Sequence, residues 1–351
     1  MGRPIKLKLK QPNLLIYLIL SLMLCNVSAN SAIILQYHHV SEDTPAITSL
    51  SPKQFKQHMD YLNQHNFNVV PLEQLINAIV NKTPIADKTV AITFDDGYDN
   101  VYDNARPILK QFDWPYTVFV NSDFVDQKYS RHMSWDQLRT IAKEKATIAN
   151  HTRKHDYLLH KPENLTDKQW QQQIAADIQH VEQRITTEIG QQHKLVAYPY
   201  GEFDQHTQAT LKSLGFIGIG QHSGAVGHYT DLTRVPRFPA SGIYANLDKL
   251  KIKINSLAMP ILSLEQADPV VRQNPPTVIL SVKLDDIHTK QIQCFNSGPG
   301  KAIIKWLDDK RFSVTATKPL NTGRSRYNCT APSKQKPGRF YWFSQPWVKN
   351  D

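Results

Sequence analysis

The sequence predicts an α/β domain with parallel strands, followed by a small all-β module. Short apolar runs alternate with helical segments from residue 33 to about residue 220, and this alternation is typical of parallel β/α units. After residue 253 the pattern changes to short alternating runs separated by proline-containing turns, as in antiparallel sheets. The first part holds about seven or eight β/α units, which favours a barrel.

Each element follows from a local pattern. A helix is expected to open at Ser51-Pro52, because serine is a favoured N-cap and proline suits the first helical turn. The longest helix is expected to begin with the capping box Thr166-x-x-Gln169 and to stop at Gly190. Another is expected over residues 72–80. The predicted strands of the first domain are residues 33–37, 67–70, 90–94, 116–120, 146–149, 195–198 and 216–220.

Polar stretches follow three of these strands directly, at the end where barrel enzymes build their sites. The first contains Asp95, Asp96 and Gly97, the second His151 and His155, and the third the turn around Tyr200. One of the aspartates could instead simply cap the following helix. Two histidines four residues apart would share a face of a helical turn, and with one carboxylate they form a three-ligand metal set that leaves a position open for water.

Taken together, the three stretches resemble the motifs of the polysaccharide deacetylases of carbohydrate esterase family four: Thr-Phe-Asp-Asp-Gly, His-Thr-x-x-His and Tyr-Pro-Tyr-Gly. The resemblance covers roughly residues 33–245 and implies a distorted, incomplete barrel with a divalent metal, usually Zn²⁺. Matched by position, it implies Asp95 as the catalytic base and the backbone N–H of Tyr200 as the donor to the oxyanion. The implied metal ligands are Asp96, His151 and His155.

The chain departs from the family pattern at two points. The family's third motif commonly carries an arginine shortly before the proline, but residues 194–198 contain none. We expect Arg237 to orient Asp95 instead, although a surface or structural arginine is the alternative. The general-acid histidine also lacks a clear match. His38 and His222 are the candidates, and a purely structural histidine is the alternative for His38.

The function implied by this resemblance is metal-dependent hydrolysis of N-acetyl groups on an N-acetylglucosamine (GlcNAc) polysaccharide, with release of acetate. The opening Tyr-His-His-Val and the later Ser-Pro-x-x-Phe helix resemble the subgroup that acts on poly-β-1,6-N-acetyl-D-glucosamine, a biofilm matrix polymer. A chitin or peptidoglycan GlcNAc deacetylase is the alternative within the enzyme class. Outside it, the chain could be a non-catalytic carbohydrate-binding matrix protein, but the base and all three ligands are present.

Residues 1–29 are predicted to be a secretory signal peptide, with four basic residues, an apolar run and small residues before a cleavage point after Ala29. An uncleaved anchor is the alternative. Removal of the signal peptide lowers the net charge from +10 to +6. No block of basic residues follows it, so we expect no nucleic-acid partner. We expect an exported monomer, periplasmic or at the cell surface, with a membrane-associated export machinery as a candidate partner.

The predicted domains are the signal peptide (1–29), the deacetylase domain (30–258), a linker (259–276) and the all-β module (277–351). Cys294 and Cys329 are the only cysteines left after removal of the signal, and an exported chain meets an oxidising compartment, so we expect a disulfide. Two buried free thiols are the alternative. Trp306 between them and Tyr327 before the second cysteine resemble the immunoglobulin pattern, although the interval is short for that fold.

Overall fold

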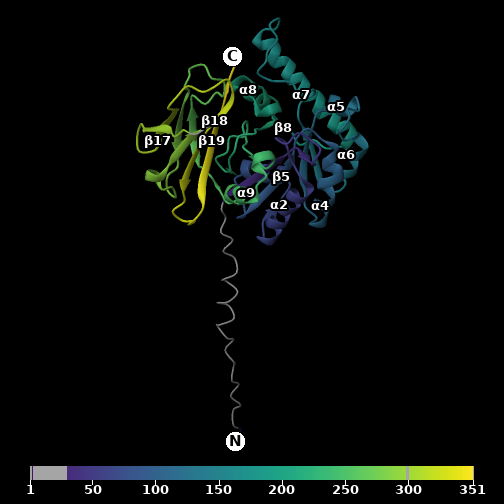
Figure 1. Ribbon diagram of the computed structural model, residues 1–351, viewed down its shortest axis with the longest axis horizontal. Helices are drawn as coiled ribbons and strands as arrows, with labels where there is room; N and C mark the ends of the chain where they lie inside the picture. Colours follow the sequence, from purple (N-terminus) through teal and green to yellow (C-terminus); the bar gives the residue numbers. More distant parts are fainter. Residues whose placement is uncertain (1, 3–29, 298–299, 351) are drawn as a thin grey trace.

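The computed structural model describes residues 2, 30–297 and 300–350 (Figure 1). The predicted signal peptide, apart from Gly2, lies outside the described residues. Within the described ranges, no helix combines the length and the apolar character needed to cross a membrane. Helices surround a curled sheet in one half of the molecule, and the other half consists mainly of strands (Figure 1).

The first half is organised around a nine-stranded sheet in the order β10-β1-β5-β6-β7-β8-β9, with β4 paired to β5 and β11 paired to β1. The strands from β1 to β9 along this path pair in parallel. Their bounds are β1 Ser31–Tyr37, β4 Asn68–Val69, β5 Thr89–Phe94, β6 Tyr116–Val120, β7 Ala146–Asn150, β8 Leu195–Ala197, β9 Ile217–Ile219, β10 Val226–Gly227 and β11 Phe238–Pro239. A two-stranded sheet, β2 His39–Val40 with β3 Ser49–Leu50, lies beyond β1.

Residues 235–239 bridge the two ends of this curled sheet. Val235 forms a parallel bridge with Ile219 at the end of β9, and three residues later β11 pairs in parallel with β1. The ring of strands is therefore completed only by short, irregular pairing, as expected for a distorted barrel. This bridge matters for the site because it carries Arg237 between its two paired points.

The helices begin and end where local sequence signals place them. Capping boxes open α2 at Ser51 and α7 at Thr166, and α7 ends at Gly190, whose φ of 77° suits glycine. The buried side chains of α2 lie on one face and pack on the barrel core. The helices are α2 Pro52–Gln64, α3 Leu72–Val80, α4 Arg106–Gln111, α5 Ser122–Asp126, α6 Trp135–Ala142, α7 Asp167–Ile189, α8 Gln205–Leu214 and α9 Leu247–Ile254, with short turns η1 Val101–Ala105, η2 Pro199–Gly201, η3 Gly242–Tyr244 and η4 Thr289–Gln291.

The second half is an all-β module of two four-stranded sheets, β12-β19-β18-β15 and β13-β14-β17-β16. A separate hydrophobic core fills the space between them. The strands are β12 Leu257–Ala258, β13 Ile261–Glu265, β14 Thr277–Val282, β15 Gln293–Asn296, β16 Ala302–Trp306, β17 Arg311–Ala316, β18 Gly323–Pro332 and β19 Phe340–Lys349. The stretch expected to be a linker, residues 259–276, thus contains β13, because Ile261 and Leu264 pack against the module core.

A disulfide joins Cys294 to Cys329, as predicted. The two cysteines are paired partners on the neighbouring antiparallel strands β15 and β18, so the bond lies within one sheet, whereas the bridge of immunoglobulin domains links the two sheets. Trp306 is 40 % exposed on β16 and packs on Phe312. The cysteine, tryptophan and tyrosine pattern therefore does not have the immunoglobulin arrangement in this module.

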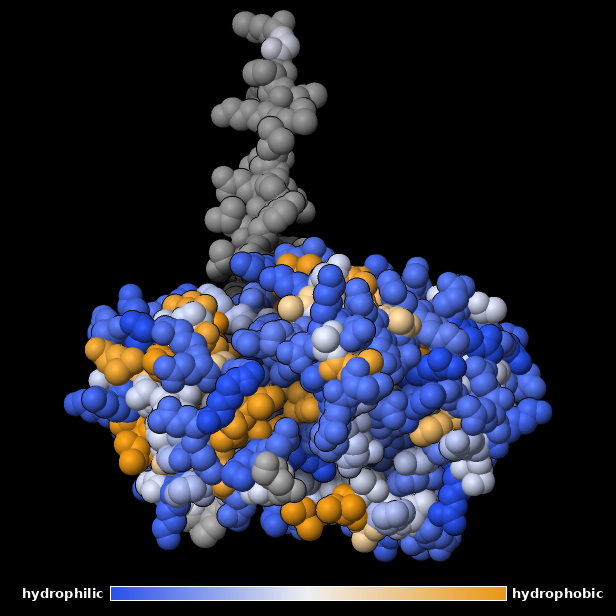
Figure 2. Space-filling model, turned by 90° about the horizontal axis from the view of Figure 1, so that it is seen from above, coloured by the Kyte–Doolittle hydropathy of each residue, from blue (hydrophilic) through white to orange (hydrophobic). Residues whose placement is uncertain are grey.

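The module packs closely against the barrel. Strand β12 follows α9 after two residues and pairs with β19. Trp342 of β19 packs edge-to-face on Phe238 of β11, with ring centroids 5.3 Å apart. Arg339 donates to the Asp87 carboxylate at 2.6 Å. On the face of the whole molecule seen in Figure 2, hydrophobic residues form scattered groups in a mainly hydrophilic surface.

Candidate active site

The two aspartates occupy the point where β5 leaves the sheet. The Asp95 backbone N–H still bonds to the Tyr37 carbonyl of β1, at 3.0 Å, so Asp95 ends the strand pairing. Asp96 and Gly97 then both adopt a φ of 70°, which turns the chain sharply. A Cβ atom on Gly97 would lie 3.0 Å from Val120 Cγ1, so this turn also needs the small residue.

The histidine pair comes from an irregular loop after β7, and this differs from the helical turn that the spacing suggested. Thr152 and His155 have φ values of 66° and 58°, which no right-handed helix contains. The loop is held by the side chain of Asn150, whose Oδ1 accepts the Thr152 N–H at 2.9 Å. His151 and His155 lie together as expected, but a loop with positive φ angles places them there and a helical turn does not.

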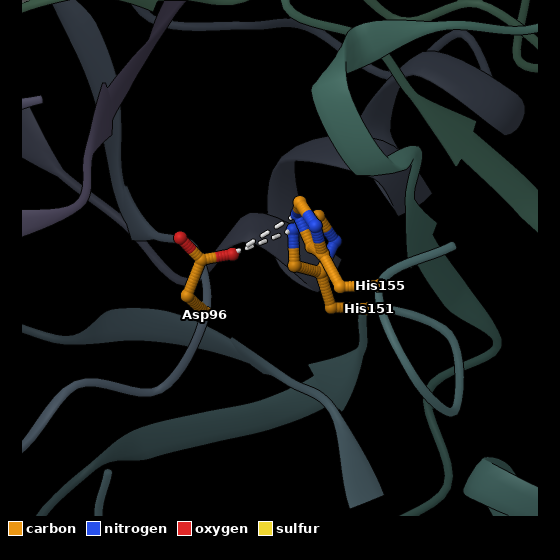
Figure 3. Close-up of side chains that lie close together, drawn as sticks. All are labelled: Asp96, His151 and His155. Atoms are coloured by element: carbon orange, nitrogen blue, oxygen red, sulfur yellow. Dashed lines mark ion pairs between the residues drawn. The ribbon is translucent and has the colours of Figure 1, made fainter. Parts of the chain in front are cut away.

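Asp96, His151 and His155 converge on one point (Figure 3). The Asp96 Oδ1 atom lies 3.1 Å from His151 Nε2 and 3.3 Å from His155 Nε2. One ligand atom from each of the three residues lies within 4.8 Å of the other two.

The surroundings of His151 and Asp96 show whether these residues suit a metal. The His151 Nδ1 lies 2.8 Å from the Ala197 carbonyl, which can only accept, so Nδ1 carries a proton and Nε2 points toward Asp96. Within the described residues, both His151 Nε2 and Asp96 Oδ1 are buried and lack a hydrogen-bond partner. The pair needs a positive charge between its atoms, either a metal ion or a second proton on His151, whose pKa is lowered by burial but raised overall by Asp96 and Asp95. A carboxylate oxygen with two imidazole nitrogens is a donor set for a divalent metal.

Asp95 lies beside this set but is held by a different group of side chains. It is completely buried, and Arg237 donates to both of its oxygens at 2.7 Å, Nη1 to Oδ1 and Nη2 to Oδ2. Gln36 Nε2 donates to Oδ2, also at 2.7 Å. Burial raises the pKa of Asp95, but Arg237 and the nearby His151 outweigh it and lower the pKa to about 2. Asp95 is therefore ionised at neutral pH.

The two candidate proton donors lie in different places. His38, one residue beyond β1, has its Nε2 atom 3.8 Å from Asp95 Oδ2. His222 lies in the loop after β9, where its backbone carbonyl accepts from the Arg237 N–H at 3.0 Å, and its ring faces Phe203 at 6.2 Å. No contact within the described residues joins the His222 ring to Asp95 or to the three convergent residues. The structure therefore places His38 beside Asp95, whereas His222 lines a pocket with Tyr200 and Arg324.

Residues 82–219 match the model of the polysaccharide deacetylase family. This span contains both aspartates, both histidines and the Tyr200 turn. The match covers less than half of the chain, and this span is similar in sequence to that family. The resemblance expected from the three motifs is thus confirmed.

Related proteins carry the same family name or a more specific one. A putative polysaccharide deacetylase of Bacillus subtilis is 28 % identical over 55 % of this chain and 65 % of its own length. A poly-β-1,6-N-acetyl-D-glucosamine N-deacetylase of Escherichia coli is 22 % identical over 75 % of this chain and 42 % of its own length. The chain thus spans less than two thirds of either relative. A Staphylococcus aureus protein of the same name is 24 % identical over 59 % of this chain and 78 % of its own length.

Solved structures support the fold of the deacetylase domain. The deacetylase PplD of Streptococcus pyogenes superposes with a TM-score of 0.57 at 20 % identity, over 64 % of this chain and 98 % of that one. The IcaB structure from Ammonifex degensii gives a TM-score of 0.57 at 24 % identity, over 64 % of this chain and 97 % of that one. At this identity the likeness concerns the fold alone.

The turn of the third deacetylase motif lies against the histidines. Tyr200 has a φ of 58°, and its ring packs edge-to-face on His155 with centroids 4.5 Å apart. The same ring stacks on Tyr157 at 3.8 Å. The Tyr200 carbonyl accepts a hydrogen bond from Arg324 Nη1 of the β-module, at 2.6 Å.

Two neighbours of the site were not predicted from the sequence. Gln36 is a polar residue inside the apolar strand β1 and is almost fully buried, and a polar residue in such a run is a signal that could have been used. Arg324 is an exposed arginine of an accessory strand. Nothing in its local sequence points to the barrel, so only the tertiary structure reveals its contact.

Proposed function

We propose that this chain hydrolyses the acetamide groups of a GlcNAc polysaccharide, and that poly-β-1,6-N-acetyl-D-glucosamine is the substrate. The observation that carries the proposal is the pair of adjacent carboxylates with separate surroundings. Asp96 faces two imidazole nitrogens, and Asp95 is a buried, ionised carboxylate held by Arg237. This arrangement suits amide hydrolysis assisted by a metal and a base.

In this proposal Asp96, His151 and His155 hold a divalent metal, Zn²⁺ by preference. The metal, when bound, would polarise the acetamide carbonyl and acidify the attacking water. The His151 ring is oriented for this role because its Nδ1–H is fixed on the Ala197 carbonyl.

The remaining residues move or hold protons. Asp95 accepts a proton from the attacking water as the new C–O bond forms, and Arg237 and Gln36 fix the orientation of its carboxylate. The Tyr200 backbone N–H donates to the developing oxyanion. As the C–N bond breaks, His38 gives a proton to the leaving amine. We favour His38 over His222 because only His38 lies close to Asp95. The products are acetate and a free amine.

The substrate assignment has weaker support than the reaction class. It rests on the Tyr-His-His-Val opening of the sequence and on the names of the Escherichia coli and Staphylococcus aureus relatives. Residues 1–29 and the Cys294–Cys329 bond suit export to an oxidising compartment. We therefore propose that the protein acts as an exported monomer in the periplasm or at the cell surface, where a membrane-associated export machinery could present the polymer.

Acetate release from a panel of substrates tests this proposal. The metal-loaded protein, residues 30–351, is assayed on β-1,6-linked GlcNAc oligomers, chitooligosaccharides and peptidoglycan, with Asp95→Asn as the matched control. We expect the highest kcat/KM on the β-1,6 oligomers, and a loss of about 10² to 10⁴ in Asp95→Asn. Faster release from chitin or peptidoglycan would move the assignment to that linkage. Saccharide binding without acetate release from any substrate would favour the non-catalytic matrix protein.

A further inference from the structure

The β-module reaches the candidate active site through Arg324. This side chain projects from the start of β18, and its Nη1 donates to the Tyr200 carbonyl at 2.6 Å. Its guanidinium carbon lies 5.8 Å from the centre of the Tyr200 ring, and its Nε lies 3.7 Å from the carboxylate of Glu202. Since the Tyr200 ring contacts His155, only one residue separates Arg324 from the convergent histidines.

A groove opens on the other side of Arg324. It has a volume of about 640 Å³ and lies between η3 of the barrel and strands β15 and β18 of the module. Its lining includes Tyr244, Phe295, Arg324, Arg326 and Asn328. Arg324, Arg326 and Asn328 alternate along β18, so they belong to one face of the strand. The groove thus continues the surface that begins at Tyr200.

The groove combines aromatic rings with fixed polar groups, as saccharide sites do. Phe295 is 37 % exposed and offers a ring face to an apolar sugar face. Arg326 Nη2 donates to the Tyr244 hydroxyl at 2.7 Å, so Tyr244 keeps its own O–H free to donate onward. The Arg326 side chain is only partly buried and lines the groove, so its guanidinium can donate to a ligand acceptor there.

The charge around the groove is positive. None of the described lining residues is acidic. Behind Tyr244, Lys253 Nζ lies 4.2 Å from the ring centre, and burial together with Arg326 and Lys249 lowers the pKa of Lys253 to about 8. The Glu202 carboxylate faces Arg324 from the barrel side. A groove lined by positive side chains favours ligands with carbonyl oxygens and disfavours ligands that carry a positive charge.

We propose that this groove is an additional subsite that binds N-acetylated sugar units of the same polymer and rejects units already deacetylated. The inference rests on the proposed function. The acetamide carbonyl of a bound unit accepts from Arg326, and a sugar ring packs on Phe295. A glucosamine unit brings an ammonium group to the two arginines and is repelled. Deacetylation of one unit then weakens binding of the chain next to it, so the modified units become spaced along the polymer.

Binding to the inactive Asp95→Asn protein tests the subsite without turnover. The probes are β-1,6-linked and β-1,4-linked GlcNAc pentasaccharides and their fully deacetylated counterparts, measured by calorimetry. We expect the acetylated pentasaccharide to bind at least about tenfold more tightly than its deacetylated form. Arg326→Gln and Phe295→Ala, each added to Asp95→Asn, should weaken binding by about tenfold, as loss of a charged hydrogen bond or an aromatic contact does. Lys305→Gln, on an exposed position of the opposite sheet, is the matched control and should bind as the parent does.

Equal affinity of the groove variants and the parent overturns the subsite, as does equal binding of acetylated and deacetylated pentasaccharides or no binding of either. Melting temperatures of the variants establish that they are folded. In the active chain, Arg326→Gln should abolish the gain in kcat/KM between disaccharide and pentasaccharide. If the groove variants release acetate with the same kcat/KM as the parent on both oligomers, the subsite is refuted and the proposed function is not. Groove-dependent binding without acetate release refutes the function and leaves the saccharide site.

Discussion

Asp95 and Asp96 are neighbours in the sequence but meet opposite surroundings. Asp95 is enclosed by donors, with both oxygens on Arg237 and one also on Gln36. Asp96 faces two imidazole nitrogens and keeps a buried oxygen that has no hydrogen-bond partner in the described part of the chain. The first environment stabilises an ionised carboxylate without a metal, whereas the second is satisfied only by a cation. This difference supports the separate roles that we propose for the two carboxylates.

The first prediction tests this separation. Asp96→Ala, His151→Ala and His155→Ala should each lower both bound metal and activity, because each removes one of three ligands. Asp95→Asn should retain the metal and lose turnover, because it removes only the proton acceptor. Metal analysis beside the acetate assay measures both. Stoichiometric metal in the double variant His151→Ala with His155→Ala would contradict the ligand assignment.

Arg237 supplies a second residue-scale prediction. Its ion pair holds the pKa of Asp95 at about 2, so the pair stabilises the fold above the ordinary aspartate pKa of about 4, and this stability is lost as the pH falls toward 2. Arg237→Gln removes the strongest group that lowers the pKa of Asp95, so the effect of burial, which raises it, should outweigh the remaining effect of His151. The variant should then lose stability as the pH rises through that higher pKa, by about 3 to 5 kcal/mol at pH 7.

Denaturant unfolding and pH–rate profiles measure both consequences. The acid limb of kcat/KM should move to higher pH in Arg237→Gln, because the carboxylate must be ionised to accept a proton. The matched control is Arg272→Gln, at an exposed arginine paired with Asp268, which should change stability by less than about 1 kcal/mol. Wild-type stability and an unmoved acid limb in Arg237→Gln would show that the pair does not control Asp95.

At the scale of elements, signals within one turn were readable from the sequence, whereas the pairing of distant strands was not. The Ser51-Pro52 start, the capping box at Thr166 and the stop at Gly190 predicted helix ends correctly, since caps depend on residues three or four apart. Strand β13 was missed because prolines and polar residues follow it in the same stretch. The contact of Arg237 with Asp95 was expected only through family resemblance, since it spans 142 residues.

The disulfide gives an element-scale prediction. It joins paired residues of β15 and β18 with 35 residues between them in sequence. In the chain-entropy model, a loop of this length stabilises the fold by about 3 to 4 kcal/mol. Replacing both cysteines, Cys294→Ala with Cys329→Ala, should lower the melting temperature accordingly and leave bound metal unchanged. Mass spectrometry of the unreduced protein from residue 30 should detect no alkylatable thiol, and two alkylatable thiols would refute the bond.

At the scale of the whole molecule, barrel and module share one interface. Trp342 is half-buried and packs against the barrel core beside Phe238. Arg234 of the barrel is buried and donates to Gln345 Oε1 of β19 at 2.8 Å. Arg324 ties β18 to the Tyr200 turn. Because aromatic packing and buried hydrogen bonds join the barrel to the module, we expect the two to unfold together and not as independent domains.

The last prediction tests this coupling with Trp342→Ala. Truncation removes the ring that packs on Phe238, which for a large aromatic core residue costs about 3 to 5 kcal/mol. Since Trp342 is only half-buried, we expect about 2 to 4 kcal/mol, seen as one calorimetric transition at a lower temperature. Trp306→Ala, at a tryptophan 40 % exposed on the far sheet, is the matched control and should cost less than half as much. Two separate transitions in the wild-type protein, or a loss of stability in Trp342→Ala that affects only one of them, would show that the module folds independently. The contact of Arg324 with Tyr200 would then join two domains that unfold separately.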